Sequence, residues 1–154
     1  MQAGQIEMLQ RMPVFGGIRA EVLGLLLDHA AHRRLPAGQA FFREGEPGDR
    51  MFVLEAGRAA VVKGWQGSEV LLHHLEAGDC FGEMALMDLF PRSASVIAET
   101  DCVAIELTTE SLAGLFERDL EQFALIQMNI GREVCRRLRA ADDRLFRLRM
   151  GEAD

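Results

Sequence analysis

Between residues 35 and 107 the chain is divided into short apolar runs by turns that contain glycine or proline. The runs are Gln39–Arg43, Arg50–Glu55, Arg58–Lys63, Glu69–Leu75, Ser95–Ala98 and Cys102–Leu107. They recur at intervals of about ten residues, and each is too short for a stable helix. This segment is therefore expected to form the strands of a β-sandwich or jelly roll.

The segments on either side of these runs have helical patterns. Val22, Leu26 and Ala30 recur at helical spacing within residues 1–34. Residues 119–150 contain no proline and a single glycine, which favours one long helix. The expected fold is mainly β with flanking helices: a double-stranded β-helix (jelly roll) with an N-terminal helical segment and a long C-terminal helix.

The length of 154 residues fits one domain. We expect this single domain to comprise N-terminal helices at 1–34, a β-roll at 35–107 and C-terminal helices at 108–154. Residues 108–118 begin with Thr108 and Thr109, a plausible N-cap, and are expected to form a short helix before the long one.

The long helix carries an apolar seam that suits a partner helix. The seam residues recur at close to 3.5 residues and are Phe123, Ile130, Val134, Ala141, Leu145 and Leu148, with Leu138 alongside. The seam predicts a homodimer; the competing interpretation is that it packs on the β-roll of its own chain. Residues 132–149 also contain seven arginines against three acidic residues, which indicates either a solvated face or a surface for nucleic acid or an acidic partner.

Residues 81–96 carry the groups that indicate a ligand. Gly82 allows the backbone to approach a ligand closely, because it has no Cβ. Arg92 offers a planar fork of donors for phosphate oxygens, and Glu83 only accepts hydrogen bonds when ionised, which suits a sugar hydroxyl. The segment between them is apolar and helix-capable, and the first turn of a helix attracts anions. A small phosphorylated sugar or a nucleotide satisfies this set; the alternative is a strand–turn–helix with a solvated Arg and Glu.

The segments FGEMAL and PRSASV resemble the phosphate-binding cassette of the cyclic nucleotide-binding domains. This family includes the catabolite activator proteins of the Crp/Fnr type, the regulatory subunits of cyclic-AMP-dependent kinase and cyclic-nucleotide-gated channels. The matching residues are Gly82, Glu83, Ala85, Leu86, Pro91, Arg92, Ala94 and Val96. The stretch from Pro36 to Gly57 is also similar to the opening of the family's β-roll.

The resemblance implies specific roles for residues of the cassette. Arg92 would bind the cyclic phosphate and Glu83 the ribose 2′-hydroxyl. The implied binding set is Phe81, Gly82, Glu83, Met84, Ala85, Arg92, Ser93 and Ala94. Base contacts are expected from the closing C-terminal helix, from Arg139 and Asp142.

The sequence is therefore interpreted as a cyclic nucleotide sensor, not an enzyme, with cyclic AMP favoured over cyclic GMP. Ligand binding would move the C-terminal helix and so act on a partner or effector. Two alternatives are a Crp/Fnr-type transcription regulator truncated before its DNA-binding domain and a ligand-blind structural or dimerisation domain. A third, a metal enzyme on a cupin-like jelly roll, would need clustered histidine and glutamate ligands that the sequence lacks.

Composition narrows the remaining possibilities. The three cysteines are widely spaced and form no CxxC pair, which favours reduced thiols and a cytoplasmic location. His29 and His32 have no cysteine or carboxylate cluster to complete a metal site, so no metal is expected. No apolar run is long enough to span a membrane, and there is no basic-then-apolar leader. The net charge of −7 and the lack of a recognition helix predict no direct binding of nucleic acid.

Overall fold

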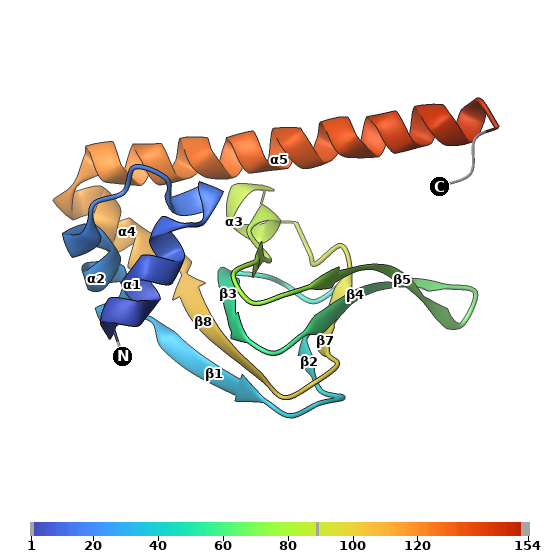
Figure 1. Cartoon of the computed structure of the whole chain (residues 1–154), viewed down its shortest axis with the longest axis horizontal. Coiled ribbons are helices and arrows are strands. Elements are labelled where there is room, and N and C mark those ends of the chain that lie inside the picture. Colours follow the sequence, from blue (N-terminus) through green and yellow to red (C-terminus); the bar gives the residue numbers. More distant parts are fainter. Residues whose placement is uncertain (1, 89, 152–154) are drawn as a thin grey trace.

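The computed structural model describes residues 2–88 and 90–151. Its helices are α1 (Gln2–Gln10), the 3-10 helix η1 (Pro13–Phe15), α2 (Ala20–Asp28), α3 (Met84–Asp88), α4 (Thr109–Arg118) and α5 (Leu120–Arg149). Its strands are β1 (Ala31–Leu35), β2 (Ala40–Phe42), β3 (Arg50–Ala56), β4 (Ala59–Trp65), β5 (Ser68–Leu75), β6 (Cys80–Phe81), β7 (Ser95–Ala98) and β8 (Cys102–Thr108). The expected fold class is confirmed: antiparallel strands form a roll, with helices at one end and a long helix along it (Figure 1).

The roll consists of two antiparallel four-stranded sheets. One has the strand order β1-β8-β3-β6 and the other β2-β7-β4-β5. Inward-facing side chains of both sheets meet in an aromatic cluster in which the rings of Phe52 and Phe81 stack at 5.1 Å and Phe41 packs edge-on against Phe81. This cluster underlies β6, the strand that leads into the cassette.

The first strand starts earlier than the sequence predicts. Residues 31–34 were expected to end the N-terminal helical segment, but they belong to β1, which pairs with β8 from Ala31↔Glu106 to Leu35↔Cys102. The helical apolar stripe ends at Ala30, and the following His-Arg-Arg alternates along a strand at the edge of its sheet. Pairing with β8 therefore decides the conformation of a segment that carries no helical stripe of its own.

A second core joins the helices to the β3–β8 face of the roll. It includes Leu9, Phe15, Leu23, Leu26, Ile105, Leu115, Ile126 and Ile130, all at most 2% exposed. The amide of Asn129 on α5 donates to the carbonyl oxygens of Val14 at 3.1 Å and Gly16 at 2.9 Å. These bonds fix the first half of α5 against the N-terminal helices.

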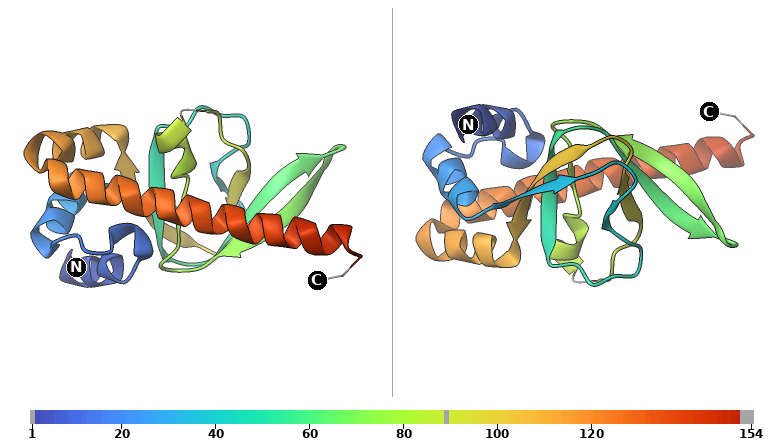
Figure 2. Two further views of the ribbon diagram at one scale, coloured as in Figure 1. Left: turned by 90° about the horizontal axis from the view of Figure 1, so that it is seen from above. Right: turned by 90° about the horizontal axis from the view of Figure 1, so that it is seen from below.

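The predicted seam of α5 is wrong for three of its residues. Ile130 is fully buried in the helical core of its own chain, and Phe123 and Val134 pack against that core. The intrachain interpretation is correct for this part of the stripe, because the domain needs an apolar helix face to close its own core. Beyond it α5 runs along the roll toward the β4–β5 hairpin (Figure 2), and Leu145 and Leu148 near its end are more than half exposed.

Within the described residues no helix is both long and apolar enough to cross a bilayer, although α5 has 30 residues. The same residues contain no group of three or more histidine, cysteine, aspartate or glutamate side chains that would hold a metal ion.

Candidate functional site

The turn from β6 into α3 is built around Gly82. Its φ of +80° lies in the left-handed region that residues with a Cβ rarely adopt. A Cβ at this position would stand 2.7 Å from Nη1 of Arg92 and 3.2 Å from the carbonyl oxygen of Arg50. Glycine is therefore required both for the turn and for the close approach of the arginine.

Arg92 is buried beside this turn, with 7% of its surface exposed. Its Nη1 donates to the carbonyl oxygen of Gly82 at 3.0 Å and its Nη2 to that of Arg50 at 2.9 Å. Its guanidinium lies over the ring of Phe42, 4.0 Å from the centroid. Burial lowers the pKa of Arg92. Within the described residues its guanidinium forms no ion pair, and its buried Nε has no hydrogen-bond partner. A buried cation without a counter-ion is a site prepared for an anion.

Glu83 is 1% exposed and forms an ion pair with Arg137 of α5. The guanidinium of Arg137 also donates to the carbonyl oxygen of Cys80 at 3.4 Å and pairs with Glu133 at 3.4 Å. The cassette is thus tied directly to the long helix by a charged contact. Since α3 is only five residues long, the charge of the site comes from these side chains more than from a helix dipole.

These groups line one cavity of about 430 Å³. Apolar side chains of β4, β5 and β7 form one wall, and Phe90 and Pro91 also line the cavity. The lining residues from these elements are Val61, Leu72, Leu75 and Val96, with His73 beside them. The volume and the mixture of an apolar wall with a few convergent polar groups are typical of a small-molecule site.

The charges of the lining suit a monoanion. Arg92, Arg137 and Glu83 sum to one positive charge. Burial, followed by the charge of Arg137, lowers the pKa of His73, which keeps that imidazole neutral at pH 7. Burial also raises the pKa of the Cys80 thiol to about 12, so it adds no negative charge. A ligand with one negative charge would balance the charge of the cavity lining.

The structure brings most of the predicted site residues together. Phe81, Gly82, Glu83, Met84, Arg92, Ser93 and Ala94 all line the cavity. Ala85 follows Met84 in α3, but its side chain lies outside the described part of the chain, as does Leu89. Arg139 and Asp142 do not line the cavity; Arg139 borders a separate shallow groove on α5 with Met128 and Cys135.

Sequence reasoning missed Arg137 and His73. Arg137 is one of seven arginines in residues 132–149, and the register of the helix relative to the roll could not be predicted from the sequence. The signal was the core stripe of Ile126, Ile130 and Val134: continuing that face by three or four residues leads to Arg137, whereas Arg139 lies on the opposite face.

Comparison with known proteins agrees with the geometry. The family described as "Cyclic nucleotide-binding domain" matches residues 32–119. This range includes the cassette, α4 and both sheets, apart from the first residue of β1. The chain belongs to the cyclic nucleotide-binding domain family.

Particular relatives come from two kinds of regulator. The cyclic AMP receptor protein of Thermus thermophilus is 32% identical over 142 residues, covering 92% of this chain and 64% of the relative. A cAMP-dependent protein kinase regulatory subunit of Aspergillus niger is 34% identical over 99 residues, covering 64% of this chain and 24% of the relative. This chain thus spans less than two thirds of either relative.

Solved structures have the same fold. A cyclic nucleotide-binding domain of Methylobacillus flagellatus superposes with a TM-score of 0.82 at 23% identity, covering 94% of this chain and 82% of that one. The catabolite activator protein of Thermus thermophilus gives a TM-score of 0.78 at 32% identity, covering 88% of this chain and 62% of that one.

Proposed function

We propose that this protein is a cytoplasmic sensor that binds a cyclic nucleotide in the cavity between the cassette and α5, with cyclic AMP preferred over cyclic GMP. The observation that carries the proposal is the buried guanidinium of Arg92, which lacks a counter-ion among the described residues and stands beside the buried acceptor Glu83. The cyclic phosphate docks on Arg92, the ribose hydroxyl on Glu83, and the base lies against the apolar wall of β4 and β5.

The preference for cyclic AMP is supported by the relatives. The Thermus thermophilus relative is a cyclic AMP receptor and the Aspergillus niger relative a subunit of a cAMP-dependent kinase. Ser93 lines the cavity and its hydroxyl suits either nucleotide, so the choice of base falls to groups farther from the phosphate, among them His73.

Coupling of the ligand to α5 is supported by the shared carboxylate. A ribose hydroxyl that binds the Glu83 carboxylate either displaces Arg137 from it or binds beside Arg137. In both cases the hydroxyl changes the contact that holds α5 to the cassette. Binding shifts the position of α5 only to the extent that the ligand prefers one position over the other. The C-terminal half of α5, whose side chains are exposed from Cys135 onward, is the part that would transmit this shift to an effector.

We also propose that α5 forms a homodimer, through a stripe different from the one that the sequence suggested. An exposed stripe runs along the side of α5 away from the core in alternating steps of four and three residues. Its members are Ala124, Met128, Gly131, Cys135, Leu138, Asp142 and Leu145. This is the spacing of a coiled coil, and the small residues in its middle allow close approach. These residues are the outer stripe of α5.

Isothermal titration with cyclic AMP and cyclic GMP tests the binding proposal. Arg92→Ala should weaken cyclic AMP by about 30- to 1,000-fold, because a desolvated charge-assisted contact contributes about 2–4 kcal/mol. Arg43→Ala, which removes an exposed arginine outside the cavity, is the matched control and should bind normally. Binding by Arg92→Ala within a factor of about three of the parent would place the ligand elsewhere.

The parent should also prefer cyclic AMP to its 2′-deoxy analogue by about 1–3 kcal/mol, because the deoxy form leaves the buried Glu83 carboxylate without a hydroxyl donor. Equal affinity for the two would remove Glu83 as the hydroxyl acceptor. A cyclic GMP affinity above that of cyclic AMP would reverse the proposed preference while leaving the site in place.

A further inference from the structure

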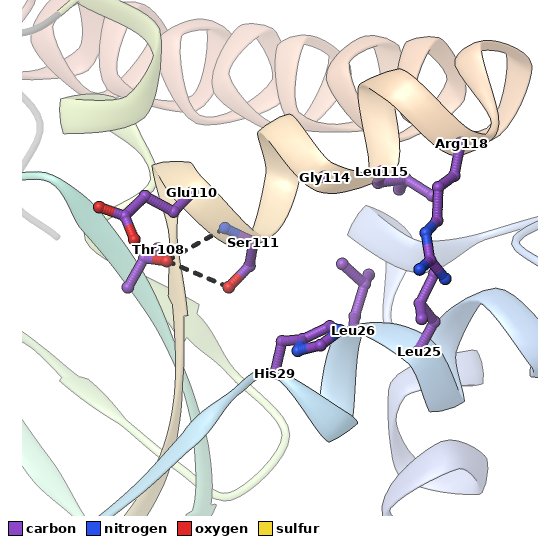
Figure 3. A pocket seen from close by; sticks show the side chains of 9 residues that line it. All are labelled: Leu25, Leu26, His29, Thr108, Glu110, Ser111, Gly114, Leu115 and Arg118. Carbon is purple, nitrogen blue, oxygen red and sulfur yellow. Dashed lines mark hydrogen bonds between the residues drawn. The ribbon is translucent and has the colours of Figure 1, made fainter.

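A second cavity, of about 420 Å³, lies between α2 and α4, away from the cassette (Figure 3). None of its lining residues belongs to the cyclic nucleotide cavity. They are Leu25, Leu26, His29, Thr108, Glu110, Ser111, Gly114, Leu115 and Arg118. Its volume is close to that of the first cavity, and like the first it combines a leucine wall with a few polar groups.

The side chains of Arg118 and His29 in this second cavity make no polar contacts with the described residues. Arg118 projects from the last turn of α4 toward α2, and His29 follows the end of α2 (Figure 3). Across residues 2–88 and 90–151, neither of these side chains has a hydrogen bond or an ion pair. The neighbouring Arg19 differs, since it pairs with Glu21 and Asp119.

The remaining polar groups make the two ends of the cavity differ in charge. Oγ1 of Thr108 accepts from the backbone N–H of Ser111 at 3.1 Å and lies 3.1 Å from its hydroxyl, so both side chains are engaged in capping α4. Glu110 stands beside Thr108, at the end of the cavity away from Arg118 (Figure 3). Its charge disfavours an anion at that end, so the anionic group of a ligand belongs at Arg118.

The wall between these two ends is apolar. Leu26 and Leu115 are 2% and 1% exposed and belong to the helical core, and Leu25 is half-buried beside them. Gly114 stands on α4 between the two ends, and a Cβ added there meets no atom within 4 Å. The space in front of this exposed glycine is therefore open with respect to every residue that the structure describes.

We propose that this second cavity binds an aliphatic monocarboxylate. The planar fork of Arg118 matches a carboxylate in two parallel hydrogen bonds, and the leucine wall takes the hydrocarbon body, with His29 at its rim. A single guanidinium and the nearby Glu110 do not suit a polyanion such as a nucleoside triphosphate. This inference is independent of the proposed binding of cyclic nucleotides.

Titration of the full chain with octanoate tests the proposal. Binding is measured by calorimetry or by the NMR shifts of residues near 114. Arg118→Gln should weaken octanoate at least about tenfold, since it removes a charged bidentate contact. Arg34→Gln is the matched control, because Arg34 is an exposed arginine of β1 outside the cavity. Octanamide, which has the same body without the charge, should bind at least about tenfold more weakly than octanoate.

Filling the cavity gives a second, independent test. Gly114→Leu should abolish octanoate binding, whereas Gly114→Ala, which leaves most of the space open, should retain it. Both changes favour the helix, because glycine is a poor helix former, and circular dichroism checks that both variants are folded. Unchanged octanoate binding in Gly114→Leu, equal binding of octanamide, or no saturable binding by the parent would each overturn the proposal.

Arg92→Ala separates the two cavities. It should lose cyclic AMP binding and keep octanoate binding. If octanoate is displaced by cyclic AMP and lost in Arg92→Ala, the carboxylate binds in the first cavity and the inference about the second is wrong. If cyclic AMP fails to bind the parent while octanoate binds as described, the proposed function is wrong and the second site stands.

Discussion

The carboxylate of Glu83 and the guanidinium of Arg137 form an ion pair across 54 residues of sequence, from the buried floor of the cassette to the middle of α5. The two partners are unequally buried: the Glu83 side chain is 1% exposed and that of Arg137 46%. The carboxylate therefore depends on this contact far more than the guanidinium does, and α5 is attached to the cassette at the point where a ligand hydroxyl would bind.

Removing the guanidinium should destabilise the protein through Glu83. Arg137→Gln leaves a buried carboxylate without its cationic partner, and we expect a loss of about 1–3 kcal/mol in the free energy of unfolding, measured in urea. Arg139→Gln, an exposed arginine two residues farther on, is the control and should change stability by less than about 0.5 kcal/mol.

A double-mutant cycle tests whether this loss comes from the pair. If it does, adding Glu83→Gln to Arg137→Gln should recover part of it, with a coupling of about 0.5–3 kcal/mol. Additive losses would show that Arg137 stabilises the helix by some other contact, such as its pairing with Glu133.

The requirement for glycine at position 82 can be separated into strain and close approach. Gly67, in the β4–β5 turn, has nearly the same φ, +81° against +80°, but a Cβ there meets no atom within 4 Å. Gly67→Ala should therefore lower the free energy of unfolding by only about 1–2 kcal/mol, the cost of holding a residue with a Cβ in the left-handed conformation. Gly82→Ala adds a clash with Arg92, so it should cost more stability and also weaken cyclic AMP, whereas Gly67→Ala leaves affinity unchanged. Equal effects of the two variants on affinity would mean that Arg92 adapts without loss.

Local chemistry made the roll and the cassette predictable from the sequence. Glycine-punctuated runs specified the strands, and Gly82, Glu83 and Arg92 were predicted as neighbours and do line one cavity, because turn geometry and donor type are encoded by neighbouring residues. The register of α5 was not predictable in the same way. Its arginines and apolar residues recur on more than one face, and only packing against Val14, Gly16 and the helical core decides which face turns inward.

The burial of Cys80 makes its thiol inert at neutral pH. Burial raises its pKa to about 12, and the thiolate is the reactive form. In the native protein a thiol reagent at pH 8 should label exposed Cys135 quickly and Cys80 and Cys102 slowly, with all three thiols labelled after unfolding. Fast labelling of Cys80 in a Cys135→Ser variant, located by peptide mapping, would mean that the cassette opens on the time scale of the reaction.

The same shift predicts an alkaline loss of stability. Because the folded-state pKa of Cys80 lies above its ordinary value of 9.0, the folded protein holds this proton more tightly than the unfolded chain. The contribution to stability is fully present below about pH 9 and declines between about pH 9 and 12 as the unfolded chain releases the proton. Cys80→Ala should flatten this part of the profile in chemical denaturation at a series of pH values; an unchanged slope would assign the alkaline loss to other groups.

The outer stripe of α5 makes the dimer testable with two exposed leucines on the same helix. Leu138 belongs to the stripe and is 59% exposed, whereas Leu148 lies off it and is 56% exposed. Burial of Leu138 against its symmetry mate would make Leu138→Asp place two carboxylates in the interface, so this variant should be a folded monomer in light scattering. Leu148→Asp has the same chemistry off the stripe and should remain dimeric.

Oxidation of Cys135 provides a positive test of the same interface. In a parallel pair aligned on the outer stripe, Cys135 faces its own copy near the twofold axis, at a separation suited to a disulfide. Mild oxidation should therefore convert the parent to a dimer that a reductant separates in gel electrophoresis, and Leu138→Asp should prevent this. A monomeric Leu148→Asp together with a dimeric Leu138→Asp would instead place the contact on the seam that includes Leu148, and a parent that is monomeric at all concentrations would exclude the dimer.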